Sequence, residues 1–155
     1  MKKSLSYFMR STEPEVITVP GPSSIKDEAG NVVDLQIMVL SQATISKINK
    51  NYTIRSIATD GHGNPLVLNG EVVWKVERDA ARATAHMIVE ALQYPNLRDP
   101  ELMAHYGCKD ITEMPMAVFS RPAEFSHVSK MVMSALGLSG ESSSTPNKEL
   151  EDAKN

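Results

Sequence analysis

The sequence has a single cysteine and no long run of apolar residues. Cys108 therefore has no partner for an intramolecular disulfide, and no Cys-x-x-Cys pair is present to hold zinc. The apolar residues near the N-terminus are interrupted by Ser6 and ended by Arg10, well short of the roughly 7–15 apolar residues of a signal peptide. No apolar run reaches the roughly 18 residues that a membrane-spanning helix needs. We expect a soluble, unexported protein in a reducing cytoplasm, with no membrane partner.

An excess of positive charge is also missing. Lys and Arg number 16 against 19 Asp and Glu, which gives a formal net charge of −3 and a pI near 5.8. Such a chain has no electrostatic reason to bind nucleic acid or an anionic membrane. Its 155 residues fit one domain, which can bury a hydrophobic core without a metal or a disulfide.

Patterns for catalysis or for metal binding are absent from the sequence as well. The four histidines fall in separate segments, and none forms a His-x-x-x-His pair that would aim two ligands at one metal. Cys108 has no local base that would make it a nucleophile. Asp99 and Glu101 are better explained as a helix cap and a first-turn residue than as a catalytic pair. We predict no enzymatic activity, no cofactor and no metal site.

The most informative stretch runs from Tyr94 to Gly107, where one helix ends and a short second helix begins. Pro95 cannot continue a helix and disfavours the α conformation before it, so the preceding helix should end near Gln93 or Tyr94. Asp99 is an N-cap acceptor, and Pro100 occupies a position where its missing N–H costs nothing. Gly107 can take the left-handed conformation that closes a helix. These signals predict a two-turn helix from Pro100 to about Tyr106.

The N-terminal half combines strand patterns with turn residues. Residues 1–14 read as an arm, and 15–40 as a small antiparallel β element in which residues 33–39 alternate apolar and polar side chains. Ser41 can cap a helix that extends to about Tyr52. Residues 53–77 should form a hairpin or loop excursion, because Asn69-Gly70 between two apolar runs is typical of a two-residue hairpin turn.

The C-terminal half is patterned for helices. A helix from Ala80 to Gln93, capped by Asp79, is apolar over most of its circumference and should be the core helix. Further helices are predicted over 110–119 and from Pro122 to Leu136, and residues 139–155 lack the apolar content to fold. The predicted fold class is therefore α+β and predominantly α. A single domain over 15–138 should contain the small N-terminal β element and a compact helical part of four to five helices, and a disordered tail should follow it.

Methionine is unusually frequent, with nine residues. Thioether side chains fill irregular cores and also form adaptable surfaces for protein partners. Met87 and Met131 lie on core stripes of their predicted helices. Met103 and Met133 lie closer to the edges of such stripes, and we take these two as candidate partner-binding residues.

Several segments, in this order and spacing, resemble the XkdN-like phage tail assembly chaperones. The similarity covers about residues 8–138, and 79–136 is its specific part. Thr53–Glu77 departs from the family pattern by being more strand-like, and Met103 stands where a polar residue is more usual. The matching segments are the Asp-Glu-x-Gly turn and strand over Asp27–Leu40, the helix with Met87-Ile88-Val89-Glu90, the turn Tyr94-Pro95-Asn96-Leu97, the helix Asp99-Pro100-Glu101-Leu102 to Tyr106-Gly107, and the terminal helix that begins Pro122-Ala123-Glu124-Phe125.

The resemblance implies an assembly chaperone in the cytoplasm of the host bacterium, encoded by a phage or prophage. Its partner would be the long tape measure protein, kept soluble until the tail tube protein polymerises around it. The resemblance also implies a second form of the chain extended by ribosomal frameshifting, for which Ala153-Lys154-Asn155 permits a slippery codon run; an ordinary solvated tail is the alternative. Two alternatives are a structural tail accessory protein and a small helical adaptor or nucleic-acid-binding regulator. The second alternative would use the helices predicted over 100–106 and 110–119 as a DNA-binding pair, but the helix over 110–119 carries almost no basic residues.

Overall fold

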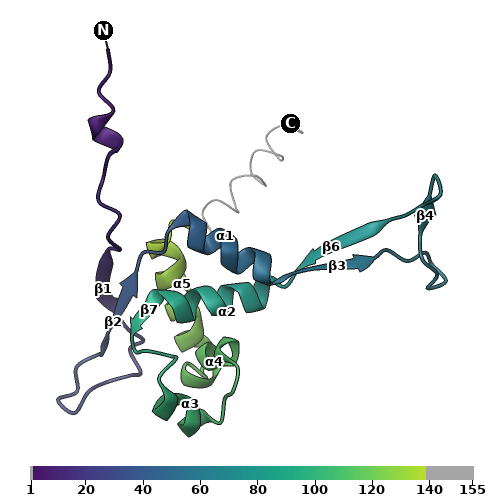
Figure 1. The fold of residues 1–155 in the computed structure, drawn as a ribbon. Helices are drawn as coiled ribbons and strands as arrows, with labels where there is room; N and C mark the ends of the chain where they lie inside the picture. The colour runs from purple at the N-terminus through teal and green to yellow at the C-terminus, as the bar shows by residue number, and fades with distance from the viewer. Residues whose placement is uncertain (1, 139–155) are drawn as a thin grey trace, which may run out of the picture.

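The computed structural model describes residues 2–138, whose elements surround one central helix (Figure 1). The predicted disordered tail over 139–155 and the candidate frameshift site lie outside the described residues. The helices are α1 (Gln42–Asn51), α2 (Ala80–Ala91), α3 (Pro100–Tyr106), α4 (Met114–Val118) and α5 (Pro122–Ala135), with 3-10 turns η1 (Ser6–Phe8) and η2 (Ile111–Glu113). The strands are β1 (Val16–Pro20), β2 (Asp34–Met38), β3 (Thr53–Ile57), β4 (Val67–Leu68), β5 (Glu71–Val72), β6 (Trp74–Arg78) and β7 (Leu92–Tyr94).

The largest sheet has three antiparallel strands in the order β1-β2-β7. The alternating pattern of β2 sends Leu35 and Ile37 into the core, where they are 2% and 0% exposed, as the sequence predicted. β7 uses the residues directly after α2 and pairs Leu92 with Ile37. The sheet therefore receives its third strand from the end of the core helix.

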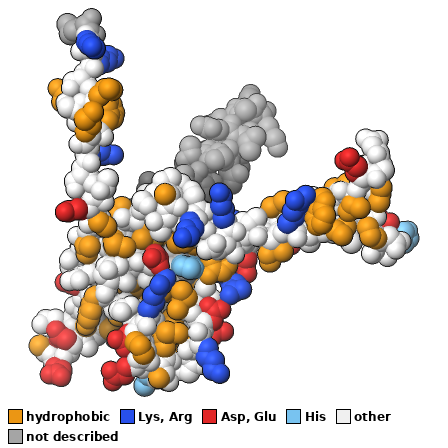
Figure 2. Space-filling model, viewed as in Figure 1, with side chains coloured by type: hydrophobic (Ala, Val, Ile, Leu, Met, Phe, Trp, Pro, Cys, Tyr) orange, Lys and Arg blue, Asp and Glu red, His pale blue; other side chains and the backbone are white. Residues whose placement is uncertain are grey.

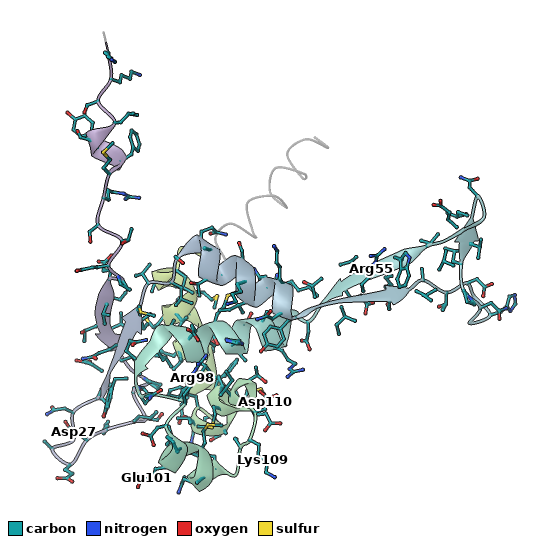
Figure 3. The ribbon with its side chains drawn as sticks, viewed as in Figure 1. Asp27, Arg55, Arg98, Glu101, Lys109 and Asp110 are labelled. Carbon is teal, nitrogen blue, oxygen red and sulfur yellow. The ribbon has the colours of Figure 1, made fainter. Side chains whose placement is uncertain are left out.

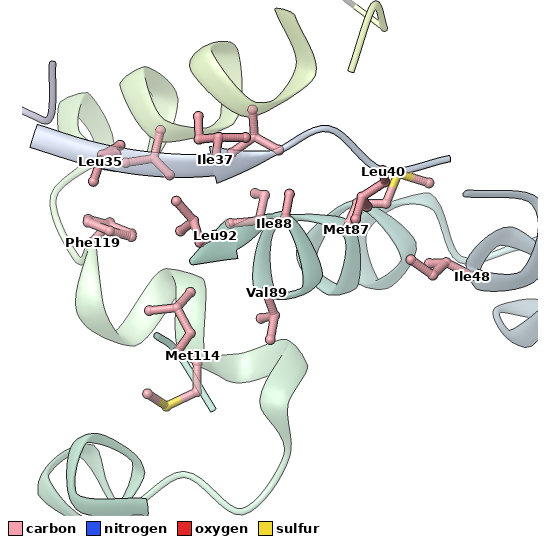
Figure 4. Close-up of a cluster of buried hydrophobic side chains, with 14 of the residues drawn as sticks. Leu35, Ile37, Leu40, Ile48, Met87, Ile88, Val89, Leu92, Met114 and Phe119 are labelled. Carbon is pink, nitrogen blue, oxygen red and sulfur yellow. The ribbon is translucent and has the colours of Figure 1, made fainter. Parts of the chain in front are cut away.

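The core helix α2 is buried on several sides, which confirms the prediction from its apolar circumference. Ala83, Ile88 and Ala91 are fully buried, and the helix contacts α1, α4, α5 and η2. Figure 4 shows Met87, Ile88 and Val89 of α2 between the side chains of β2 and those of α1 and α4. This single hydrophobic cluster joins the N-terminal and C-terminal halves of the chain.

The segments after α2 agree only in part with their predicted helices. α3 has the predicted bounds, with Asp99 as its N-cap and Gly107 in the left-handed conformation at φ 65°. The helix predicted over 110–119 is instead a 3-10 turn followed by the short α4, which places Pro115 in the first turn. Proline is tolerated there because a first-turn N–H has no partner within the helix.

A long two-stranded ribbon projects away from the domain between α1 and α2 (Figure 1). It consists of β3 and β6, which pair from Thr53 with Arg78 to Ile57 with Trp74, and it continues into the distal hairpin β4–β5. The hairpin turns at Asn69-Gly70, where both residues have positive φ, as the sequence predicted. All ten residues of β3 and β6 are exposed, so the ribbon packs against no other element along these strands.

The predicted fold class was wrong, because the described chain is not predominantly helical. It is 39% helical and 23% strand, with five helices and seven strands in three small sheets. Helix was lost in two places. Residues 92–94 pair with β2 instead of extending α2, and α4 has only five residues. Strand was gained along residues 53–78, where the predicted short hairpin is the distal end of a longer ribbon.

Candidate protein-interaction surfaces

The turn that links α2 to α3 is held by its own polar side chains. The Asp99 carboxylate accepts hydrogen bonds from the backbone N–H groups of Glu101 and Leu102, at 2.9 and 3.2 Å. The Asn96 side chain accepts one from the Arg98 N–H at 3.1 Å. Leu97 is fully buried and fixes the turn to the core. The turn is thus rigid on one side and solvent-exposed on the other.

An open hollow of about 520 Å³ lies beside this turn. Tyr94 is 53% exposed at its wall, and Asp99 and Glu101 give it acidic groups. Six of the ten motif residues that the sequence singled out line the hollow, whereas Leu97, Pro100, Tyr106 and Gly107 do not. Its lining residues are Gln93, Tyr94, Pro95, Asn96, Asp99, Glu101, Leu102 and His105.

The titratable side chains of α2 are Arg82, His86 and Glu90, and the charges of Arg82 and Glu90 are paired with residues of neighbouring elements. The Arg82 guanidinium donates to the Asp110 carboxylate at 2.9 Å, and Glu90 forms an ion pair with Arg98. Figure 3 labels Arg98 and Asp110 on the segments that face α2. Hydrogen bonds from the backbone and side chain of Thr112 lower the pKa of the Asp110 carboxyl, and Arg82 lowers it further. These two ion pairs join α2 to the turn before α3 and to the start of η2.

His86, the third polar position of α2, connects the core helix to the base of the ribbon. Its Nδ1 lies 2.7 Å from the Tyr52 hydroxyl in a hydrogen bond, and Tyr52 is the last residue before β3. Burial lowers the pKa of the His86 imidazole, an effect that Arg98 reinforces and that Glu90 and Asp110 oppose. Arg82 adds a cation–π contact, with its guanidinium carbon 5.4 Å from the centre of the Tyr52 ring. The ribbon therefore leaves the domain from a fixed anchor.

The two methionines predicted to contact a partner lie in different elements, and each is half-buried. Met103 is in α3 and Met133 in α5, and both pack against the core cluster. Met116 in α4 is the most accessible methionine outside the N-terminal segment, at 69% exposed. A role for Met103 and Met133 in partner binding stays a proposal, and a charge at either position would also disturb packing.

The ribbon carries an exposed apolar surface that the sequence reasoning missed (Figure 2). Trp74 is 50% exposed and Val76 is 65% exposed. Part of the signal was present in the sequence, because Trp74 and Val76 alternate with polar residues along 74–78, whereas residues 53–57 show no such alternation. The exposed large apolar side chains of the ribbon and its distal hairpin are Ile54, Ile57, Val67, Leu68, Val72, Trp74 and Val76.

A second exposed apolar segment precedes β1. Tyr7 and Phe8 of η1 are 79% and 81% exposed, and no residue of η1 is buried. Lys2, Lys3 and Arg10 make residues 2–10 basic, and Glu13 and Glu15 follow directly before β1. In Figure 1 this segment extends upward from β1 at the left, whereas the ribbon extends to the right.

No group of three or more His, Cys, Asp or Glu side chains among residues 2–138 is placed to hold a metal ion. Within the same described range, no helix is long and apolar enough to cross a membrane.

Two polar side chains of α5 contact the end of β1 and the loop after it. The Nε2 of His127 lies 2.9 Å from the Pro20 carbonyl oxygen. Glu124 is 9% exposed and accepts a hydrogen bond from Ser24 at 2.8 Å, so α5 holds the loop after β1 through these two side chains.

Comparison with known proteins gives one family match and one match to a solved structure. A family model described as phage XkdN-like tail assembly chaperone protein matches residues 5–154. The crystal structure of the protein YqbN matches with a TM-score of 0.66 and 22% sequence identity, over 88% of this chain and 98% of that one. No curated protein matches. At this identity the structural match shows a shared fold only.

Proposed function

We propose, because this chain belongs to the phage XkdN-like tail assembly chaperone family, that it binds the tape measure protein and keeps it soluble while the tail tube assembles. The family match over residues 5–154 is the observation that carries this proposal. The tail tube protein and a frameshift-extended form of the chain are further proposed partners. The proposed site of action is the cytoplasm of the host bacterium, and the proposal includes no catalytic step and no cofactor.

The physical features of the molecule support such a role. A chaperone for a helical partner must offer apolar surface without losing its own fold. Here the core cluster is closed around α2, while the ribbon and the N-terminal segment hold exposed apolar side chains outside it. Partner binding can therefore use surface that the domain does not need for stability. This separation of core from apolar surface is what the proposed function requires.

Co-expression with the cognate tape measure protein should raise the soluble yield of that protein several-fold, without added ATP or metal. The physical reason is that bound chaperone covers apolar stripes that would otherwise aggregate. The measurement is the soluble fraction of the tape measure protein after centrifugation, together with its co-purification on a tag carried by the chaperone.

The matched control is an Ile88→Asp variant, which buries a charge in the core and should neither fold nor protect the partner. An unchanged soluble yield with the correct partner contradicts the proposed function. Retention of the chain in purified phage particles would instead identify a structural tail protein. The regulator reading has little support, because α3 has only seven residues and an acidic first turn.

A further inference from the structure

The two faces of the β3–β6 ribbon differ in composition. Directly opposed residues of an antiparallel pair point to the same side, so the register sorts the side chains into two sets. One set, which we call the arginine face, consists of Thr53, Arg55, Ile57, Trp74, Val76 and Arg78. The other, the ion-pair face, consists of Ile54, Ser56, Lys75 and Glu77.

The charges on the ion-pair face cancel, whereas those on the arginine face do not. Lys75 and Glu77 form a salt bridge 2.5 Å long. Arg55 and Arg78 form no salt bridge with any residue of the described range 2–138. The arginine face therefore combines three apolar side chains with two positive charges that lack a carboxylate.

Arg55 is held in position by an aromatic neighbour. Its guanidinium carbon lies 4.5 Å from the centre of the Trp74 ring, and Figure 3 shows Arg55 on the shaft of the ribbon. A guanidinium stacked on a ring still has its N–H edge free for a planar carboxylate. The stacked pair thus presents an apolar ring and an oriented cation side by side.

We propose that the arginine face docks an amphipathic helix of the tape measure protein, with apolar residues against Trp74, Ile57 and Val76 and acidic residues against Arg55 and Arg78. This proposal rests on the proposed function and adds the binding surface. The dimensions agree: strands of five residues span about 17 Å, close to three helical turns of about 5.4 Å. The spacing of about 4.8 Å between the two strands makes the ribbon about as wide as one helix.

Other occupants are less compatible with this face. A second copy stacked through the same face would bring its own Arg55 and Arg78 against these two arginines. Lys2, Lys3 and Arg10 in the first ten residues repel the face in the same way. Residues 139–155 include four acidic residues but a single large apolar residue, Leu150, which is too little to cover three apolar side chains. An acidic amphipathic partner has both of the required properties.

The exposed position of the ribbon supports a role in binding. An isolated two-stranded ribbon is marginally stable in water, and this one has apolar side chains on both faces and no third strand. Its base is nevertheless fixed, because the Asp79 N–H donates to the Tyr52 carbonyl oxygen at 2.8 Å and His86 holds the Tyr52 hydroxyl. A partner helix would supply the packing that the ribbon lacks.

Variants on the two faces test the proposal in complexes with the cognate tape measure protein. Trp74→Ala should weaken binding on the order of 30-fold, as expected when a large aromatic contact is removed. Arg55→Glu should also weaken binding and should reduce its salt dependence, because an attractive charge pair is lost. The matched controls are Ile54→Ala and Lys75→Glu on the ion-pair face, which should change affinity by less than about threefold. All four positions are exposed, so the thermal unfolding midpoints should stay close to that of the wild type.

Trp74 also gives a direct readout, because it is the only tryptophan of the chain. With fluorotryptophan incorporated into the chaperone alone, its fluorine NMR signal should shift when the tape measure protein is added. If the wild type binds the tape measure protein and the Trp74→Ala and Arg55→Glu variants bind it with the same affinity, the ribbon proposal is overturned and the proposed function stays intact. Equal losses of affinity for variants on both faces would indicate that the partner adds a strand at the ribbon edge. A fluorine signal that shifts with the concentration of the chaperone alone would indicate that a second copy binds the ribbon. Either result overturns the helix-docking proposal. Failure of the wild type to form any complex overturns both proposals.

Discussion

Replacing Ile88 with alanine should lower the free energy of unfolding by about 3–4 kcal/mol, as measured by chemical denaturation. Ile88 is 0% exposed at the centre of α2, in the same buried cluster as Ile37 and Leu92 (Figure 4). The loss combines the transfer free energy of the deleted methyl and methylene groups with the cavity that they leave. Because domains are typically stable by only about 5–15 kcal/mol, the variant would have a large unfolded population on mild heating.

Ile54→Ala is the matched control for Ile88→Ala, because it deletes the same atoms from a ribbon position that is 59% exposed. Its free energy of unfolding should change by no more than about 0.5 kcal/mol. A loss below about 1 kcal/mol for Ile88→Ala, or equal losses for the two variants, would show that α2 is not the centre of the core.

Replacing Gly21 with alanine should lower the free energy of unfolding by about 2–3 kcal/mol. A Cβ at this position would lie 2.2 Å from the carbonyl oxygen of Val33, which also accepts a hydrogen bond from the Gly21 N–H at 3.2 Å. Backbone cannot rotate away as a flexible side chain can, so the end of β1 must move from the loop that enters β2. The measurement is again the denaturation midpoint, with far-UV circular dichroism to follow the loss of structure.

The control for Gly21→Ala is Gly61→Ala at the distal loop of the ribbon. Apart from Gly61 and its two chain neighbours, no residue has an atom within 4 Å of a Cβ built there, and Gly61 does not have a positive φ. Its stability should match that of the wild type, or exceed it slightly because alanine restricts the unfolded chain. If Gly21→Ala were as stable as Gly61→Ala, the close approach of Gly21 to Val33 would be wrong.

Local signals in the sequence were sufficient for the elements that are stabilised locally. The cap at Asp99, the proline after it and Gly107 act within a few residues, so α3 was predicted at both ends. The alternation that buries Leu35 and Ile37 and the Asn69-Gly70 turn are equally local. For such elements the sequence contains most of the information that decides the structure.

The elements that sequence reasoning missed depend on partners far away in the chain. Leu92 looks like a continuation of α2, and only its pairing with Ile37 of β2 makes it a strand residue. Thr53 and Arg78 pair across the whole ribbon, which no short window of sequence reveals. Sheet pairing of this kind overrides helix propensity, and it is the physical reason that the predicted predominance of helix was wrong.

The candidate surfaces were predictable to a similar extent. The turn motif around Asp99 was located correctly, but the hollow beside it requires Gln93, Glu101 and His105 to be brought together in space. The arginine face follows from the β3–β6 register, so the roles of Arg55 and Trp74 could not be read before that pairing was known. The frequency of methionine led to the prediction that Met103 and Met133 contact a partner. These two side chains are half-buried, whereas the apolar side chains of the ribbon are exposed.

The proposed separation of a closed core from an exposed surface that binds the tape measure protein can be tested by amide hydrogen exchange. In the free chain, residues 80–91 of α2 should exchange slowest, and residues 53–57 and 74–78 of the ribbon should exchange far faster. In the complex with the tape measure protein, the ribbon amides should become protected while those of α2 keep their rates. Unchanged exchange rates of the ribbon amides in a stable complex, or new protection confined to α2, would contradict binding at the ribbon.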